Sequence, residues 1–200
     1  MNQELIKDAV MDMLLELSNI GTGNAATSLS RMFGNEAVGI EVPTSLLCPI
    51  SKFAELLPNP EEEIVGTLRM IEGDVGAIAF IQSLHDALVM AGRLLDKHLQ
   101  GLDELSRSAI DETSNIMTAS FVNALADISD MQLVPAVAGM AIGPSAAVLN
   151  SILVESGTVS DQVIVVESVF LLEQYRATGH IVFLPESTFL DILIDKFRLE

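Results

Sequence analysis

The chain has 200 residues, a length that suits one domain of generous size or two small fused halves. Its 28 acidic and 10 basic residues give a net charge of −18, which repels phosphate backbones and anionic lipid, so we expect neither nucleic-acid nor membrane binding. Half of the residues are hydrophobic but only 4% are aromatic and none is tryptophan, which predicts an aliphatic core.

Signals for export or membrane insertion are not visible in the sequence. Cys48 is a single cysteine without a partner for an internal disulfide, which fits a reducing cytosol. Residues 1–4 contain no basic region that leads into an apolar stretch, so no signal peptide is expected. No apolar run approaches the roughly 18–20 residues of a membrane helix. We therefore expect a cytoplasmic protein.

Apolar periodicity predicts the elements of the first hundred residues. Ile6, Val10 and Leu14 recur at helical spacing and belong to a long helix. Pro43 is expected to stop the strand that follows, and the turn residues 72–74 join two β-rich runs in a hairpin. The expected elements are a helix over residues 4–33, a strand over 38–42, a short helix over 49–57, strands over 64–71 and 76–82, and a helix over 84–99.

The same order of elements then starts again. The expected elements are a helix over residues 105–128, a strand over 131–134 ending at Pro135, a helix over 144–155, strands over 163–172 and 179–184, and a helix over 186–198. ELSNI at residues 16–20 corresponds to ETSNI at 112–116, and GAIAFI at 76–81 corresponds to GHIVFL at 179–184. We therefore expect one domain made of two repeats, about 1–100 and 101–200, whose strands merge into one sheet under a layer of helices.

A narrow polar stripe runs along the first predicted helix. At about 100° per residue, Glu16 lies near 40° and Asn19 near −20° from Asp12. The apolar residues of this helix cluster on its far side. Gly23 follows Asn19 by one turn and leaves bare backbone beside the polar pair.

The second long helix carries the same stripe. Ser108, Glu112 and Asn115 share one face, and the small Ala119 follows one turn later. A solvated outer face would explain one such stripe. Asparagine is an unfavourable residue inside a helix, so its position beside a glutamate in both helices favours a function.

Exposed glutamate and asparagine side chains suit a helix that acts on a partner protein. A carboxamide has one acceptor and two donors, so it can orient a water molecule. A carboxylate can pair with a lysine of the partner. The chain would then supply a positioned water to a partner that holds the metal and the electrophile, and phosphoryl transfer responds well to such positioning.

Other chemistries have weaker signals in the sequence. His85, His98 and His180 are scattered and lack metal-ligand spacing. Cys48 has no histidine near it in the sequence, which favours a small core residue over a nucleophile. The Gly-Thr-Gly segment that starts at Gly21 lacks the lysine and the full glycine spacing of a phosphate loop, so we interpret Gly21 as a site of close helix packing.

The two motifs resemble the signature of the CheC, CheX and FliY phosphatases of chemotaxis. The first motif reads Asp12-xxx-Glu16-xx-Asn19 and is followed by IGTGNAA at residues 20–26, with Pro43 downstream. The second reads Ser-xxx-Glu-xx-Asn from residue 108 to residue 115, with Pro135 downstream. The resemblance covers essentially the whole chain. Two motif copies look like CheC more than like CheX, which has a single working copy.

This resemblance implies a fold, an activity and a set of roles. The fold would be α+β, in two layers with pseudo-two-fold symmetry, and the activity would be hydrolysis of the aspartyl phosphate of CheY in two-component signalling. By resemblance, Asn19 and Asn115 orient the attacking water, and Glu16 and Glu112 bind a lysine of CheY. Mg²⁺ would belong to CheY, and the chain would need no cofactor of its own.

The resemblance also implies a second partner, the receptor deamidase CheD. Its expected contacts lie on the predicted helix over residues 144–155, at Gly143, Pro144, Val148 and Ile152. The alternative function is a non-enzymatic adaptor of the same fold that binds CheD or a flagellar-switch or chemotaxis partner. The intact Glu–Asn pairs favour the enzyme, because a pure adaptor has no need of the carboxamide.

Overall fold

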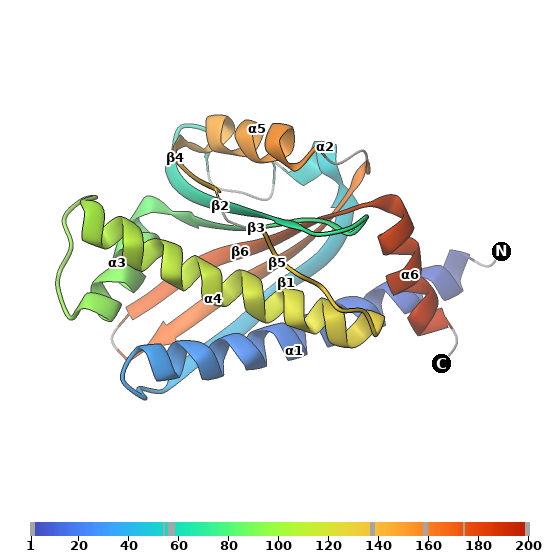
Figure 1. Cartoon of the computed structure of the whole chain (residues 1–200), viewed down its shortest axis with the longest axis horizontal. Coiled ribbons are helices and arrows are strands. Elements are labelled where there is room, and N and C mark those ends of the chain that lie inside the picture. Colours follow the sequence, from blue (N-terminus) through green and yellow to red (C-terminus); the bar gives the residue numbers. More distant parts are fainter. Residues whose placement is uncertain are drawn as a thin grey trace.

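Two sets of elements follow one another in the same order in the computed structural model, which describes residues 3–53, 55, 59–136, 139–157, 160–173 and 175–198 (Figure 1). The first set comprises α1 (Gln3–Met32), β1 (Val38–Pro49), α2 (Ile50–Phe53), β2 (Glu63–Ile71), β3 (Gly76–Ser83) and α3 (Leu84–Leu95). The second comprises α4 (Glu104–Ser129), β4 (Gly139–Pro144), α5 (Ser145–Ser156), β5 (Gln162–Leu172), β6 (Tyr175–Pro185) and α6 (Ser187–Arg198). The α+β class with two long motif-bearing helices is confirmed.

The strands form one six-stranded antiparallel sheet in the order β1-β5-β6-β3-β2-β4. The two hairpins, β2–β3 and β5–β6, meet at the centre, where β3 pairs with β6. The two edge strands are exchanged, because β1 pairs with β5 and β4 pairs with β2. Each half of the chain therefore adds its first strand to the hairpin of the other half, and the two halves interlock.

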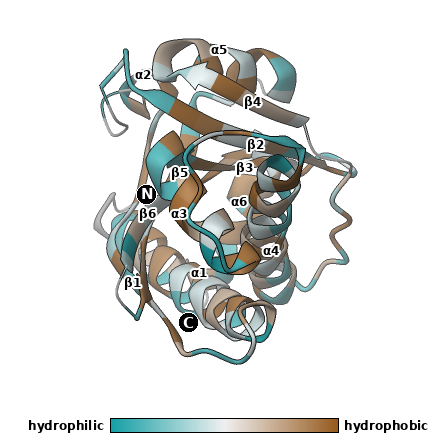
Figure 2. Cartoon of the chain, turned by 90° about the vertical axis from the view of Figure 1, so that its left-hand side faces the viewer, coloured by the Kyte–Doolittle hydropathy of each residue, from teal (hydrophilic) through white to brown (hydrophobic). Residues whose placement is uncertain are grey.

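Both faces of the central strands are buried. On one face, Ile78 and Phe80 of β3 and Phe183 of β6 pack in a core beneath the long helices α1 and α4. On the other face, residues such as Ile81 and Val182 pack with the short helices α2 and α5. Figure 2 shows α2 and α5 on the opposite side of the sheet from α1 and α4. The sheet thus serves as a rigid platform for the two motif-bearing helices.

Helices α1 and α4 lie side by side and run in opposite directions (Figure 1). Gly21 of α1 is buried against the ring of Phe121 of α4, and a Cβ at Gly21 would lie 2.8 Å from that ring. The interpretation of Gly21 as a site of close helix packing is confirmed. Ala25 and Met117, which also lie in this core, are completely buried.

Several of the predicted boundaries differ from the structure, among them the start of β6, which is Tyr175 and not residue 179. The strand expected to stop at Pro43 continues as β1 to Pro49, because the register shifts between Glu41 and Thr44 and Pro43 lies in this irregularity of an edge strand. The helix expected over 84–99 ends at Leu95, because Asp96 adopts a left-handed conformation with φ of 50°. The short helix expected over 49–57 is α2, and residues 54, 56 and 57 of that prediction lie outside the described residues.

The strand predicted over residues 131–134 is wrong. Helix α4 ends at Asp130 in a left-handed conformation, and the segment that follows makes a single bridge between Pro135 and Ile71. The edge strand of this half is β4, which begins at Gly139 and runs to Pro144. Pro144 also precedes α5 as its N-terminal flanking residue, so the predicted helix over 144–155 begins one residue later.

Candidate functional site

The first polar stripe lies on the exposed face of α1. The side chains of Asp12, Glu16 and Asn19 are exposed, and Gly23 is exposed one turn further on. The opposite face of the helix is buried in the main core, with Met13, Leu14 and Leu17 among its residues. The helical period thus separates the residues that hold α1 on the sheet from those that face solvent.

The second stripe lies on α4 and is less exposed. Ser108 and Glu112 are exposed, whereas Asn115 and Ala119 are half-buried. The hydroxyl of Ser108 donates to the carbonyl of Glu104 at 3.0 Å. The structure therefore presents two Glu–Asn pairs on two neighbouring antiparallel helices, and they differ in how far the amide projects.

Local hydrogen bonds explain how α4 keeps polar residues on both of its faces. Its buried hydroxyls bond to carbonyls one turn earlier, as Thr113 does to Ala109 at 2.9 Å and Ser114 does to Ile110 at 2.8 Å. At its start, Asp103 accepts from the Ser106 amide and the Ser106 hydroxyl accepts from the Asp103 amide, a capping box. The Ser106 backbone amide, which donates to the Asp103 carboxylate, is the main cause that lowers the pKa of Asp103.

The glutamate and asparagine side chains of both motifs have no such internal partners. Within the described parts of the chain, no hydrogen bond or ion pair engages the carboxylates of Glu16 and Glu112 or the side-chain amides of Asn19 and Asn115. By contrast, Arg93 is paired with Glu36. The four motif side chains are therefore free to bind a partner or a water molecule.

The two prolines assigned to the motifs lie outside the helices. Pro43 is exposed at the irregularity of β1, the strand that α1 contacts through a 3.1 Å hydrogen bond between the hydroxyls of Ser18 and Ser45. Pro135 is exposed beside the end of β2. Their positions associate them with the sheet on which the helices rest, and neither is a residue of the polar stripes.

The expected CheD contacts are divided by the structure. Val148 and Ile152 are 3% and 2% exposed, and both pack against Gly66 of β2, so they hold α5 on the sheet and cannot form an exposed contact. The helical period alone did not show which face of α5 meets the sheet, and CheD binding to this region stays a prediction. Gly143 is half-buried and Pro144 is exposed at the β4–α5 corner.

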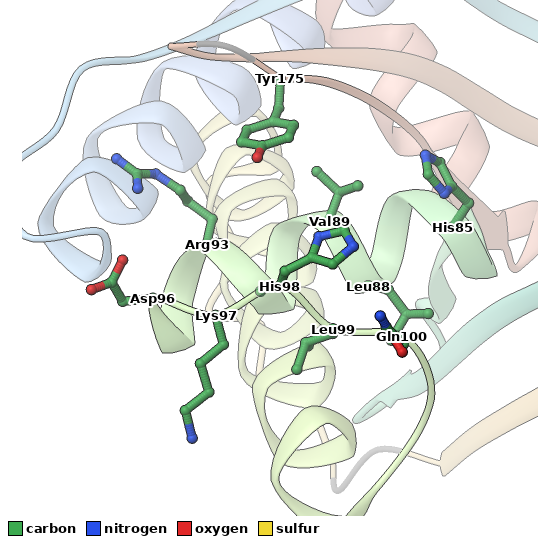
Figure 3. A pocket seen from close by; sticks show the side chains of 11 residues that line it. His85, Leu88, Val89, Arg93, Asp96, Lys97, His98, Leu99, Gln100 and Tyr175 are labelled. Carbon is green, nitrogen blue, oxygen red and sulfur yellow. The ribbon is translucent and has the colours of Figure 1, made fainter.

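The structure also contains a pocket that the sequence analysis missed. It measures about 560 Å³ and is lined by α3, by residues 96–100 after it and by Tyr175 of β6. In Figure 3 the Tyr175 ring stands over Val89 and His98, whereas Arg93 extends to the side. No motif residue lines it. Ten of its eleven lining residues lie between His85 and Gln100 and one, Tyr175, comes from β6; they form no sequence motif that would have revealed the pocket.

Neither a metal-binding cluster nor a membrane-spanning helix is present in the described part of the chain. Among the described residues, no group of three or more His, Cys, Asp or Glu side chains is placed to hold a metal ion. None of the described helices is both long and apolar enough to span a membrane. The candidate site is the pair of polar stripes on α1 and α4.

The fold is that of the chemotaxis and flagellar-switch proteins. The structure of FliY from Thermotoga maritima matches with a TM-score of 0.75 and 21% identity, over 98% of this chain and 97% of that one. The middle domain of FliM from H. pylori matches with a TM-score of 0.67 and 14% identity, over 98% and 99%.

Sequence comparison identifies the family within this class. The model of the CheC-like family matches residues 10–47, which include the whole first motif. The chain is 30% identical over 189 residues to the CheY-P phosphatase CheC of Bacillus subtilis (strain 168), which covers 90% of both chains. The chain belongs to the CheC-like family.

Proposed function

We propose that this chain hydrolyses the aspartyl phosphate of a CheY-type response regulator. The observation that carries the proposal is the pair of Glu-x-x-Asn motifs on α1 and α4, exposed except for the half-buried Asn115, whose four side chains are without internal partners in the described residues. The CheC of Bacillus subtilis, to which the chain is 30% identical, is a CheY-P phosphatase, which supports the same activity here.

The proposed mechanism divides the chemistry between two proteins. The amide of Asn19 or Asn115 enters the receiver domain and orients a water molecule for in-line attack on the phosphoryl group. The carboxylate of Glu16 or Glu112 pairs with a cationic side chain of the receiver and fixes the docking geometry. The receiver supplies the phosphoryl group and the Mg²⁺ that neutralises its charge, so this chain contributes positioning and no cofactor.

The direct test is an assay of phosphate release from a phosphorylated CheY-type receiver domain. We expect the chain to accelerate release catalytically, and Mg²⁺ removal to act through the receiver. The matched control is the receiver incubated with the Asn19→Ala/Asn115→Ala double variant, which is expected to keep the fold and lacks both amides. Equal rates with the wild-type chain, with the double variant and without either would refute the proposal.

A non-enzymatic adaptor is the second candidate function. The likeness to the middle domain of FliM favours it, because that protein has the same fold at 14% identity. An adaptor would bind a receiver domain or a flagellar-switch protein without turnover. A chain that binds the phosphorylated receiver in a titration and leaves its phosphate lifetime unchanged would support the adaptor.

We also propose CheD as a partner at the β4–α5 corner, around Gly143 and Pro144. This proposal rests on membership of the CheC-like family and on the exposure of Pro144. The corner offers no acidic side chain at residues 142–144, so we expect weaker binding than a charge-assisted contact would give. A titration of the chain with CheD, repeated after Ala147→Asp on the exposed face of α5, tests whether this surface is used.

A further inference from the structure

The two motifs differ in the residues that lead to their asparagines. On a helix, residues four apart form a ridge along the surface. The ridge that contains Asn19 reads Met11, Leu15, Asn19 and Gly23, and all four residues are exposed. The large side chains of Met11 and Leu15 are 57% and 62% exposed.

The matching ridge on α4 has a different chemistry. With the offset of 96 residues between the motifs, its residues are Arg107, Asp111, Asn115 and Ala119. Arg107 and Asp111 are exposed and charged, whereas Asn115 and Ala119 are half-buried. The exposed apolar residue of this helix, Leu105, lies seven residues before Glu112 and off the asparagine ridge. One motif is therefore preceded by an apolar ridge and the other by a charged one.

In the described part of the chain, Met11 and Leu15 have no packing role. The opposite face of α1 supplies the contacts of this helix with the core, and neither Met11 nor Leu15 belongs to a core cluster. Two large apolar side chains that stay more than half exposed directly before a functional residue are typical of a contact that is completed by a partner. Because Leu15 lies one turn before Asn19, any protein that receives the Asn19 amide must also cover Leu15.

We infer that Met11 and Leu15 dock the phosphorylated receiver domain at the α1 motif, so that this site binds its substrate through an apolar contact and the α4 site binds it through charged groups. The inference rests on the proposed phosphatase function and adds to it the residues that set the affinity of each site. The receiver surface that meets α1 must then offer an apolar patch within one or two helical turns of its phosphorylated aspartate.

The test isolates each site with an asparagine substitution. In an Asn115→Ala background, where α1 carries the activity, Met11→Gln/Leu15→Gln is expected to raise KM about tenfold with little change in kcat. In an Asn19→Ala background the same double substitution is expected to leave KM unchanged. Glutamine preserves helix propensity and adds no charge. Val154→Gln is the matched control, since Val154 is 79% exposed on α5, on the other side of the sheet.

Apolar residues placed on the α4 ridge are expected to increase the affinity of that site for the receiver. Arg107→Met/Asp111→Leu in the Asn19→Ala background is expected to lower KM at the α4 site and to flatten its dependence on salt, because screened charges are replaced by an apolar contact. An unchanged KM for Met11→Gln/Leu15→Gln in the α1-only background overturns the inference, and so does a loss confined to kcat.

A binding measurement separates this inference from the proposed function. The probe is a receiver domain whose aspartate carries a beryllium trifluoride group in place of the phosphoryl group. The phosphatase proposal fails if the wild-type chain binds this probe but does not release phosphate from the phosphorylated receiver. Binding of the probe still tests the role of Met11 and Leu15 in that case. A Kd that rises about tenfold for the glutamine double variant in the Asn115→Ala background supports the inference, and an unchanged Kd overturns it.

Discussion

Asn19 and Asn115 are the residues on which the proposed chemistry depends, because each can orient a water molecule. Asn19→Ala and Asn115→Ala are each expected to lower phosphate release, and the double variant to lose at least roughly a hundredfold in rate, since positioning of the attacking water is lost. The free energy of unfolding should stay equal or rise by about 0.5 kcal/mol, because alanine is the better helix former. Phosphate-release kinetics and urea unfolding measure the two quantities.

The control for this prediction lies on the same helix. Asn24 is exposed on α1 outside the stripe, so Asn24→Ala makes the same chemical change without removing a motif amide. Its phosphatase rate is expected to equal that of the wild type. A double Asn19→Ala/Asn115→Ala variant that folds and keeps the wild-type rate would show that the amides are not the catalytic groups.

His180 gives the fold a dependence on pH. It lies on β6 opposite Glu167 of β5, where burial lowers its pKa and the Glu167 charge opposes that shift. The pKa of His180 in the folded state is thus below the unfolded value of about 6.5, so the unfolded state binds more protons as the pH falls through this region. The free energy of unfolding is therefore expected to decrease below about pH 6.5.

The variant His180→Gln should lose this part of the pH dependence. Urea unfolding between pH 5 and pH 7.5 measures it as a smaller slope of stability against pH. His98→Gln serves as the control, because His98 is exposed and lies outside the sheet. Equal slopes for the wild type and His180→Gln would assign the acid sensitivity to other groups.

The outward direction of the motif residues could be predicted because helical spacing alone separates them from the apolar face. The smaller exposure of Asn115 compared with Asn19 could not, since the two motifs have the same Glu-x-x-Asn spacing and the difference is seen only in the folded chain. The burial of Val148 and Ile152 was missed for the same reason: α5 is apolar on several sides, and its contact with Gly66 decides which side faces the sheet.

At the scale of elements, the contact of α1 with α4 depends on Gly21. A Cβ at this position would lie 2.8 Å from the ring of Phe121, which is 1% exposed and has little room to move. Gly21→Ala is therefore expected to destabilise the protein by about 1–2 kcal/mol, because overpacking outweighs the gain in helix propensity. Chemical denaturation measures this change in the free energy of unfolding. The destabilisation by Gly21→Ala should be smaller in a chain that also carries Phe121→Leu.

An alanine at Gly23, on the same helix, is expected to stabilise the protein, in contrast to an alanine at Gly21. A Cβ at Gly23 would have no atom within 4 Å, so Gly23→Ala is expected to stabilise the protein by up to about 1 kcal/mol through helix propensity alone. Stabilisation by Gly21→Ala to the same extent would contradict the close packing of α1 on α4.

Element boundaries could be predicted where the local sequence determines them. They were missed where pairing with a neighbouring strand determines them. The hairpin of β2 and β3 followed from its turn residues, and the long helices from their periodicity. The continuation of β1 past Pro43 depends on an irregularity in its pairing with β5. Strand β4 contains Gly139 and Gly143 and has weak strand propensity, so it is formed by its pairing with the edge of β2.

At the scale of the whole molecule, the exchange of edge strands could not be read from the sequence. Duplication was visible in the repeated motifs, but repeats alone fit two independent halves equally well. The pairing of Val38 with Leu172 joins residues from the two halves of the chain, and no local pattern specifies it. The division into repeats at about residue 100 stays a prediction, and the exchange of β1 and β4 places strands of both halves in one sheet.

The interlocked sheet predicts how fragments of the chain behave. A fragment of residues 1–101 keeps the β2–β3 hairpin but loses β5, the partner of β1, and β4, the partner of β2, so it exposes unpaired edges and the core face of α1. We expect each half alone to be unfolded or to self-associate, and an equimolar mixture with residues 102–200 to form a complex with the circular dichroism of the whole chain. Size-exclusion chromatography and thermal unfolding of each fragment and of the mixture test this. A monomeric half that unfolds cooperatively at the temperature of the intact chain would show that the strand exchange contributes little to stability.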